Sequence, residues 1–163
     1  MFKPHFIFNV ITDISVDFLN TNGIKGLLLD VDNTMSVAHA DKTLREGLPE
    51  WLSEMKENGI SLIIVSNAKT KRARNFADKV GLPVIGMAAK PLPFGCLRGV
   101  KALGLKRRQV AMVGDQIFTD IMGGRLSGVK TLLVTDITPE NNSFFKIKRH
   151  FERIMLKRWK NER

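Results

Sequence analysis

The 163-residue chain contains no tyrosine, two tryptophans and one cysteine. The single cysteine, Cys96, excludes a disulfide within the chain and favours a reducing compartment, and its apolar neighbours predict a small core residue. The shortage of tyrosine and tryptophan disfavours a surface that stacks nucleic-acid bases. No stretch reaches the roughly 20 apolar residues that span a bilayer, and residues 2–15 lack the apolar run of a signal peptide. We expect a cytoplasmic protein, either soluble or peripheral on the inner face of the membrane.

Acidic residues are also few relative to basic ones. The chain has 26 lysines and arginines against 16 aspartates and glutamates, which gives a net charge of +10. This balance favours an acidic partner, such as nucleic acid, anionic lipid or a phosphorylated substrate, although a solvated lysine-rich surface explains it equally well. The length and a hydrophobic content of 44% predict a single folded domain over residues 1–163.

Short aliphatic runs alternate along the chain with amphipathic segments that close on glycine. The runs are nearly continuous, as in strands buried on both faces of a parallel sheet, and the segments between them have helical spacing. The pattern predicts an α/β fold, a Rossmann-like three-layer sandwich around a central five-stranded parallel sheet. The predicted strands lie near residues 25–31, 60–66, 83–88, 109–114 and 130–135.

Polar side chains follow four of these strands at the points where the strands end. They are Asp30 and Asp32, Ser66 and Asn67, Lys90, and Asp115 after Gly114. Because ligands bind outside the carboxyl ends of the strands in an open parallel sheet, we expect these side chains to form one site.

The paired aspartates fit phosphoryl transfer. A carboxylate can attack phosphorus in line and form a covalent aspartyl-phosphate, and this is the role predicted for Asp30. Side chains two residues apart on a strand share one side, so Asp32 is expected to protonate the leaving oxygen and then activate a water molecule.

Several acidic groups at one strand edge need a cation to offset their charge. We expect Mg²⁺ to be held by the Asp30 carboxylate, the backbone carbonyl of Asp32 and the Asp115 carboxylate. Asp120 lies slightly more than one helical turn further along. It ranks below Asp115 as a metal ligand, because it could instead orient the metal site or Lys90.

The remaining polar residues fit a bound phosphate group. Ser66 and Asn67 precede a predicted helix N-terminus and are expected to hydrogen-bond phosphate oxygens, although a helix-capping role for them is equally compatible. Thr34 could add its hydroxyl group, and Lys90 would neutralise the charge of the transferred group.

Four motifs carry a family resemblance. Taken in order, they resemble the four motifs of the haloacid dehalogenase (HAD) superfamily of phosphotransferases, and this resemblance implies the same roles for the matching residues. Position 33 is asparagine where the commonest form of the first motif has glycine. The motifs are DVDNT at 30–34, SN at 66–67, KP at 90–91 and GDQIFTD at 114–120.

Members of this superfamily often carry a cap domain that closes over small substrates. Here only 31 residues (35–65) separate the first two motifs, and only 22 (68–89) separate the second from the third. These intervals leave no room for a cap. The expected open site suits a phosphate carried on a protein, a polynucleotide or a lipid.

The last part of the sequence predicts a basic amphipathic helix over about residues 144–160. Such a helix could lie on an anionic membrane or dock on the sheet with its basic face exposed. A second basic run, which begins at Lys69, could draw acidic head groups toward the site. The predicted apolar face consists of Phe144, Ile147, Phe151, Ile154, Met155 and Trp159.

The whole chain resembles the YqeG-type branch of class III (capless) HAD phosphatases, which is similar to the mitochondrial phosphatidylglycerophosphate phosphatases. The matching text includes ITDIS, GIKGLLLDVDNT, KPLPF and GDQIFTDIMGGR. The resemblance implies Mg²⁺-dependent conversion of phosphatidylglycerophosphate to phosphatidylglycerol. Two alternatives stay open: a soluble phosphatase acting on a small metabolite or nucleotide, with an oligomer partner covering the site, and a basic RNA- or ribosome-associated protein that keeps the fold for binding.

Overall fold

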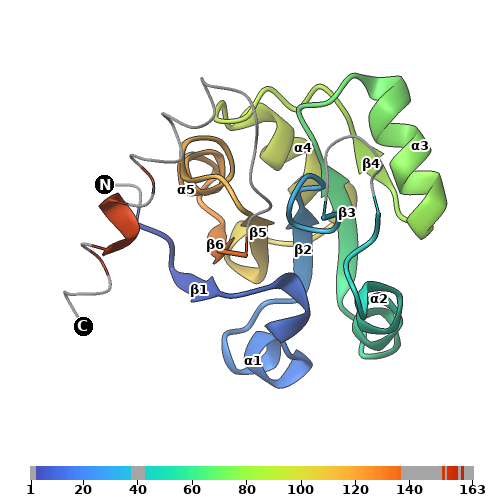
Figure 1. Cartoon of the computed structure of the whole chain (residues 1–163), viewed down its shortest axis with the longest axis horizontal. Coiled ribbons are helices and arrows are strands. Elements are labelled where there is room, and N and C mark those ends of the chain that lie inside the picture. The colour runs from blue at the N-terminus through green and yellow to red at the C-terminus, as the bar shows by residue number, and fades with distance from the viewer. Residues whose placement is uncertain (1–2, 38–42, 137–151, 153, 158, 160–163) are drawn as a thin grey trace.

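The computed structural model describes residues 3–37, 43–136, 152, 154–157 and 159, and a single parallel sheet organises them. Its strand order is β1-β6-β5-β2-β3-β4, with all neighbouring pairs parallel (Figure 1). The α/β fold with a parallel sheet is therefore confirmed. The strands are β1 (Phe6–Phe8), β2 (Gly26–Leu29), β3 (Ser61–Val65), β4 (Val84–Ile85), β5 (Val110–Gly114) and β6 (Lys130–Val134).

The predicted number of five strands is wrong, because the sheet has six. The additional strand is β1, which pairs with β6 in the register Phe6 with Leu132 and Phe8 with Val134. This strand has only three residues, and they are partly buried. It therefore lacks the long aliphatic run that identifies the central strands in the sequence. The strand predicted at 83–88 is also shorter than expected, since the backbone at Met87 has a φ of 47° and leaves the sheet.

Alternation of side chains along the central strands builds two apolar layers. Leu27 and Leu29 of β2 point into one layer, and Leu28 points into the other. Helices α1 (Val16–Thr21), α2 (Leu48–Glu57) and α3 (Thr70–Val80) contribute to the first layer, whereas α4 (Phe94–Leu103) covers the opposite face. Helix α5 (Met122–Ser127) packs on that same opposite face, where Gly124 approaches Met112 of β5. The result is the predicted three-layer sandwich (Figure 1).

Helix α2 shows how local sequence forms one of these layers. Leu48, Trp51, Leu52 and Met55 are buried at the spacing of one helix face, and Pro49 occupies the first turn. The Trp51 indole nitrogen donates a hydrogen bond of 2.8 Å to the Ile14 carbonyl, which ties α2 to the segment before α1.

The predicted C-terminal helix is described only in part. Residues 152, 154–157 and 159 are helical, whereas Phe144, Ile147 and Phe151 of its predicted apolar face lie outside the described residues. Trp159 is buried against Ile117, Ile121 and Leu133, with Met155 packed beside it. At Trp159 this stretch therefore docks on the domain. Within the described part of the chain, no helix combines the length and apolar character needed to span a membrane.

Candidate active site

Lys90 lies at the centre of a buried charge cluster at the carboxyl edge of the sheet. Its ammonium nitrogen donates to Asp30 Oδ1 at 2.7 Å and lies 2.7 Å from Asp120 Oδ1. One carboxylate oxygen from each of Asp30, Asp115 and Asp120 lies within 4.8 Å of the others, and all three residues are buried. The ends of β2 and β5, the segment after β5 and the loop after β4 therefore bring together four residues predicted from three of the motifs.

Burial and the neighbouring charges shift the ionisation of this cluster. Burial raises the pKa of Asp30 to about 8; Lys90 opposes this rise, while Asp120 and Asp115 add to it. Burial alone would lower the pKa of Lys90, but the carboxylates of Asp120 and Asp30 outweigh it and the net shift is upward. These shifts hold the Lys90 ammonium group in its charged form and favour the protonated form of Asp30 until another positive charge approaches.

The acidic residues of the cluster fit a hard divalent cation. Mg²⁺ takes oxygen ligands and is held in proteins by one or two carboxylates together with water and substrate phosphate. Asp30, Asp115 and Asp120 offer three buried carboxylates against the single ammonium group of Lys90. A divalent cation would offset the remaining negative charge.

The first motif forms a tight loop after β2. The strand ends at Leu29, and the Val31 carbonyl then accepts from the amides of Thr34 (3.3 Å), Met35 (2.9 Å) and Ser36 (3.1 Å). Asn33 has a φ of 58°, in the left-handed region that asparagine tolerates better than most residues other than glycine. This backbone requirement explains why position 33 accepts either asparagine or glycine. Asp32 thus lies in the loop and not on β2. The orientation predicted for it from the alternation of side chains along a strand therefore does not apply.

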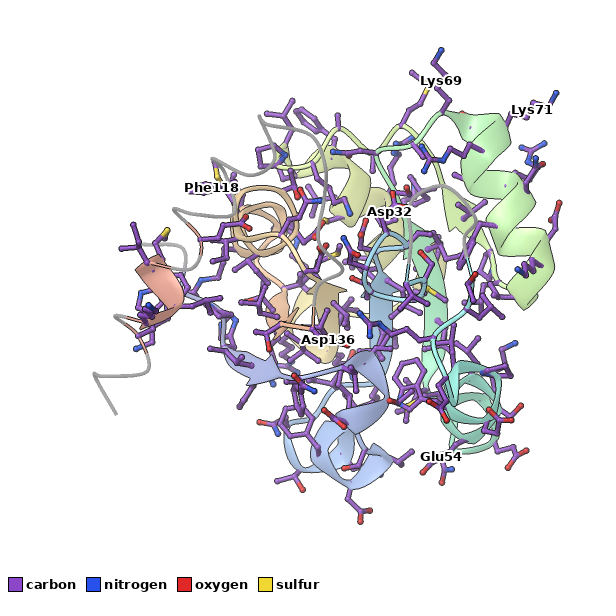
Figure 2. All side chains as sticks on the ribbon, in the orientation of Figure 1. Asp32, Glu54, Lys69, Lys71, Phe118 and Asp136 are labelled. Atoms are coloured by element: carbon purple, nitrogen blue, oxygen red, sulfur yellow. The ribbon has the colours of Figure 1, made fainter. Side chains whose placement is uncertain are left out.

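Asp32 and Thr34 differ in their surroundings. The Asp32 carboxylate is partly exposed and pairs with the Arg72 guanidinium at 3.5 Å, near the start of α3 (Figure 2). The Thr34 hydroxyl is buried, and it has no hydrogen-bond partner among the residues that the structure describes. A buried hydroxyl of this kind is suited to an oxygen-rich ligand.

Ser66 and Asn67 both help to build the site at the end of β3. The Ser66 hydroxyl accepts from the Ala68 amide at 3.1 Å within the loop before α3, and the residue that precedes the first turn of α3 is Lys69, so Ser66 does not cap this helix. The Asn67 side chain joins the second motif to the third, because its Oδ1 accepts from the Lys90 amide at 2.7 Å and its Nδ2 donates to the Lys90 carbonyl at 2.9 Å. Both polar ends of Asn67 therefore hold the backbone of Lys90, and its predicted contact with phosphate stays a prediction.

Asp120 is placed by the turn that follows β5. Its Oδ2 accepts from the Gln116 amide at 3.0 Å, while its Oδ1 faces Lys90. A Cβ atom at Gly114 would lie 2.4 Å from the Asp120 carboxyl group, so only glycine allows this approach. The contact between Asp120 and Lys90 agrees with the predicted alternative in which Asp120 orients Lys90. Asp120 is also one of the three clustered carboxylates that could hold a metal ion.

Two charged residues of the site surroundings were not predicted. Arg45 is buried and donates from Nη2 to the Asn33 carbonyl (2.7 Å), from Nε to the Thr34 carbonyl (3.1 Å) and from Nη1 to Asp136 Oδ2 (2.8 Å). Glu152 is buried and accepts from the Ile117 amide at 2.9 Å. Neither residue belongs to a short motif, and their partners are distant in sequence, so no local signal identifies them.

The motifs, their order and their meeting at one strand edge agree with a comparison to known families. The model for haloacid dehalogenase-like hydrolases matches residues 15–128. The chain belongs to this family. The predicted membership is thus confirmed, and this hydrolase can be compared with individual relatives.

Two relatives and one solved structure illustrate its position in the family. The hydrolase is 34% identical over 155 residues to the probable phosphatase YqeG of Bacillus subtilis, a match that covers 95% of this chain and 90% of the relative. It is 28% identical over 148 residues to a mitochondrial phosphatidylglycerophosphatase of Saccharomyces cerevisiae, covering 82% and 78%. The cobalt-bound deoxy-D-mannose-octulosonate 8-phosphate phosphatase of Haemophilus influenzae has a TM-score of 0.56 at 16% identity over 68% of each chain, which is a likeness of fold.

Proposed function

We propose that this hydrolase is a Mg²⁺-dependent phosphomonoesterase that acts through an aspartyl-phosphate on Asp30. The observation that carries the proposal is the buried cluster in which Lys90 lies 2.7 Å from both Asp30 and Asp120, with Asp115 beside them. To catalyse phosphoryl transfer, a protein mainly has to position the reacting groups and stabilise the charge on the transferred phosphoryl group. A nucleophilic carboxylate, a fixed ammonium group and further acidic ligands supply both.

In the first step an Asp30 carboxylate oxygen attacks phosphorus in line, and the bond from phosphorus to the ester oxygen breaks. Asp32 donates its proton to the departing alkoxide, which leaves as an alcohol. The partial exposure of Asp32 supports this role, since a leaving group has to reach it from solvent.

In the second step water attacks the phosphorus of the aspartyl-phosphate. Asp32 accepts a proton from that water, the bond between phosphorus and the Asp30 oxygen breaks, and inorganic phosphate leaves. Both carboxyl groups then return to their starting states. Lys90 stabilises the negative charge on the transferred group in both steps.

Asp30, Asp115 and Asp120, together with the backbone carbonyl of Asp32, are the groups we assign to the metal. When bound, Mg²⁺ supplies charge neutralisation between the carboxylates and the phosphate oxygens. The buried Thr34 hydroxyl and Ser66 at the start of the α3 segment would contact the phosphate. Asn67 would act mainly by holding Lys90 in place.

The substrate we favour is phosphatidylglycerophosphate. Similarity to the yeast phosphatidylglycerophosphatase over 82% of the chain supports this choice. The open approach to the site supports it as well: between the first two motifs the described residues contain only isolated bridges, α2 and the sheet strand β3, and between the second and third only α3 and β4. A phosphate on a lipid at a membrane can enter such a site without a cap.

The test is hydrolysis of phosphatidylglycerophosphate in mixed micelles, with and without Mg²⁺, compared with soluble phosphomonoesters. We expect turnover of the lipid that requires Mg²⁺ and is lost in Asp30→Asn. Turnover of soluble esters without any turnover of the lipid would refute the lipid assignment. A wild-type protein that hydrolyses no phosphomonoester would refute the activity itself.

A further inference from the structure

We propose that a surface beside the active-site entrance is the face of this hydrolase that binds an anionic lipid membrane. The surface, here called the entrance rim, consists of the basic residues Lys69, Lys71 and Arg74 and the apolar residues Met87, Leu92 and Phe94. Its biological purpose rests on the proposed lipid phosphatase function, but its membrane binding can be measured without turnover.

The apolar half of the entrance rim is unusual for a soluble surface. Among the described residues, five large apolar side chains are mostly exposed, and three of them lie between 87 and 94: Met87 (64%), Leu92 (52%) and Phe94 (64%). Scattered exposed apolar residues are ordinary, whereas a cluster of them marks an interaction site. This cluster flanks Lys90, which is itself buried.

The backbone of this loop adopts unfavourable conformations at two positions. Met87 and Ala89 have φ values of 47° and 56°, in the left-handed region that residues other than glycine rarely adopt. Hydrogen bonds from the Met87 amide to the Ala68 carbonyl (2.9 Å) and from the Ala88 amide to the Ser66 carbonyl (3.0 Å) hold the loop there. Strain that the surroundings maintain in this way is common at functional sites.

The basic half lies directly against the apolar half. Lys69, Lys71 and Arg74 are exposed at the start of α3, and Figure 2 shows the Lys69 and Lys71 side chains pointing away from the fold. A Cβ atom at Gly86 would lie 2.9 Å from Thr70 Cα, so the chain entering the apolar loop packs on the first turn of α3. The helix that carries the basic half and the loop that carries the apolar half are therefore packed together.

The entrance rim also borders the active site. The Asn67 side chain bonds the Lys90 backbone, and the Arg72 guanidinium reaches Asp32 at 3.5 Å. A membrane seated on the rim would present head-group phosphates within reach of Asp32 and Asp30. Basic residues attract anionic head groups, while apolar tips enter the boundary between head groups and acyl chains.

Lipid is the partner that fits both halves of the rim. Nucleic acid would use the basic residues and favours stacking aromatic side chains, but only Phe94 of the three apolar rim residues could stack on a base. Trp159, which the sequence places on the apolar face of the C-terminal helix, is not available to a membrane, because it is buried against Ile117 and Leu133. The structure thus assigns membrane docking to the loop and helix beside the site.

The test is co-sedimentation with vesicles of phosphatidylcholine containing phosphatidylglycerol, using the full chain. The double variants Lys69→Glu/Lys71→Glu and Leu92→Ser/Phe94→Ser remove one half of the rim each. The control Lys101→Glu/Lys106→Glu makes the same charge change elsewhere on the surface. The control Leu126→Ser/Ile154→Ser removes the other two exposed apolar side chains, at 53% and 51% exposure.

We expect both rim variants to lower vesicle affinity about tenfold and both controls to stay within about twofold of wild type. Soluble ester hydrolysis should be unchanged in all four. Equal losses in the controls would overturn the assignment of the surface. Absence of wild-type vesicle binding, or tighter binding to RNA than to vesicles at the same salt concentration, would overturn the membrane partner. Vesicle binding by the rim without any phosphatase activity would support the surface while refuting the proposed function.

Discussion

At the scale of single residues, Lys90 decides the charge state of the site. Its ammonium group contacts two buried carboxylates, and a third lies within 4.8 Å of both. One cation for three carboxylates leaves an excess of negative charge in a buried place, where it is costly. Burial is the main cause of the raised pKa of Asp30, and the neighbouring carboxylates of Asp120 and Asp115 raise it further.

Metal binding should therefore release a proton from Asp30. With the Asp30 pKa at about 8 in the metal-free protein, the group is protonated below that pH and Mg²⁺ has to displace the proton. Apparent Mg²⁺ affinity should rise about tenfold per pH unit below this value and level off above it. Calorimetric titrations across this range, in buffers of different ionisation enthalpy, measure both the affinity and the released proton. An affinity that does not change with pH would contradict the raised pKa.

Arg45 should be essential for the stability of the first-motif loop. Arg45→Ala leaves the buried carbonyls of Asn33 and Thr34 without these donors, so we expect a loss of about 2–4 kcal/mol in the free energy of unfolding. Lysine cannot reproduce the planar fork of donors, so Arg45→Lys should restore little of the loss. Urea unfolding measures the change, with Arg98→Ala on the exposed side of α4 as the control. Equal stability of the Arg45 and Arg98 variants would show that the contacts contribute little.

At the scale of elements, the segment after β5 depends on a distant part of the chain. This segment, Ile117–Ile121, carries Asp120 and begins two residues after Asp115. Glu152 accepts from the Ile117 amide at its start, and Trp159 packs against Ile117 and Ile121. Glu152 and Trp159 thus contact the segment that carries Asp120, one of the acidic residues of the site.

Glu152→Ala should weaken Mg²⁺ binding without changing any residue that we assign to the metal. The variant leaves the buried Ile117 amide without its acceptor, and loss of such a supporting contact typically lowers metal affinity by about tenfold or more. Glu152→Gln keeps an acceptor oxygen and should retain most of the affinity. The exposed Lys157→Ala on the same stretch is the control. Wild-type Mg²⁺ affinity in Glu152→Ala would limit Glu152 to a role in folding.

The elements that could be predicted from the sequence are those whose signal is local. Strands β2, β3, β5 and β6 are aliphatic runs, and the polar residues at strand ends follow from the parallel topology. Strand β1 could not be predicted, because pairing with residues 132–134 creates it. Arg45 and Glu152 were not predicted for the same reason. Their hydrogen bonds join residues far apart in the chain, and such contacts produce no local sequence pattern.

At the scale of the whole molecule, the site and the basic surface are parts of one arrangement. The sheet gathers the acidic cluster at its carboxyl edge, and the helix and loop beside that edge carry exposed basic and apolar side chains. An acidic centre suited to a cation and the proposed basic rim would together suit a phosphate presented on an anionic surface. The net charge of +10 also favours attraction of the protein to an anionic surface.

The central claim is that Asp30 carries the phosphoryl group, and trapping that group tests it most directly. An aryl phosphate with a good leaving group needs little help from Asp32 in the first step, so Asp32→Asn should accumulate the phosphoenzyme by slowing its hydrolysis. We predict that rapid acid quenching, digestion and mass spectrometry will place the phosphate on Asp30 in Asp32→Asn with Mg²⁺, and that no phosphate will be found in Asp30→Asn. Phosphate on another residue, or an Asp30→Asn variant that turns over at the wild-type rate, would contradict the account.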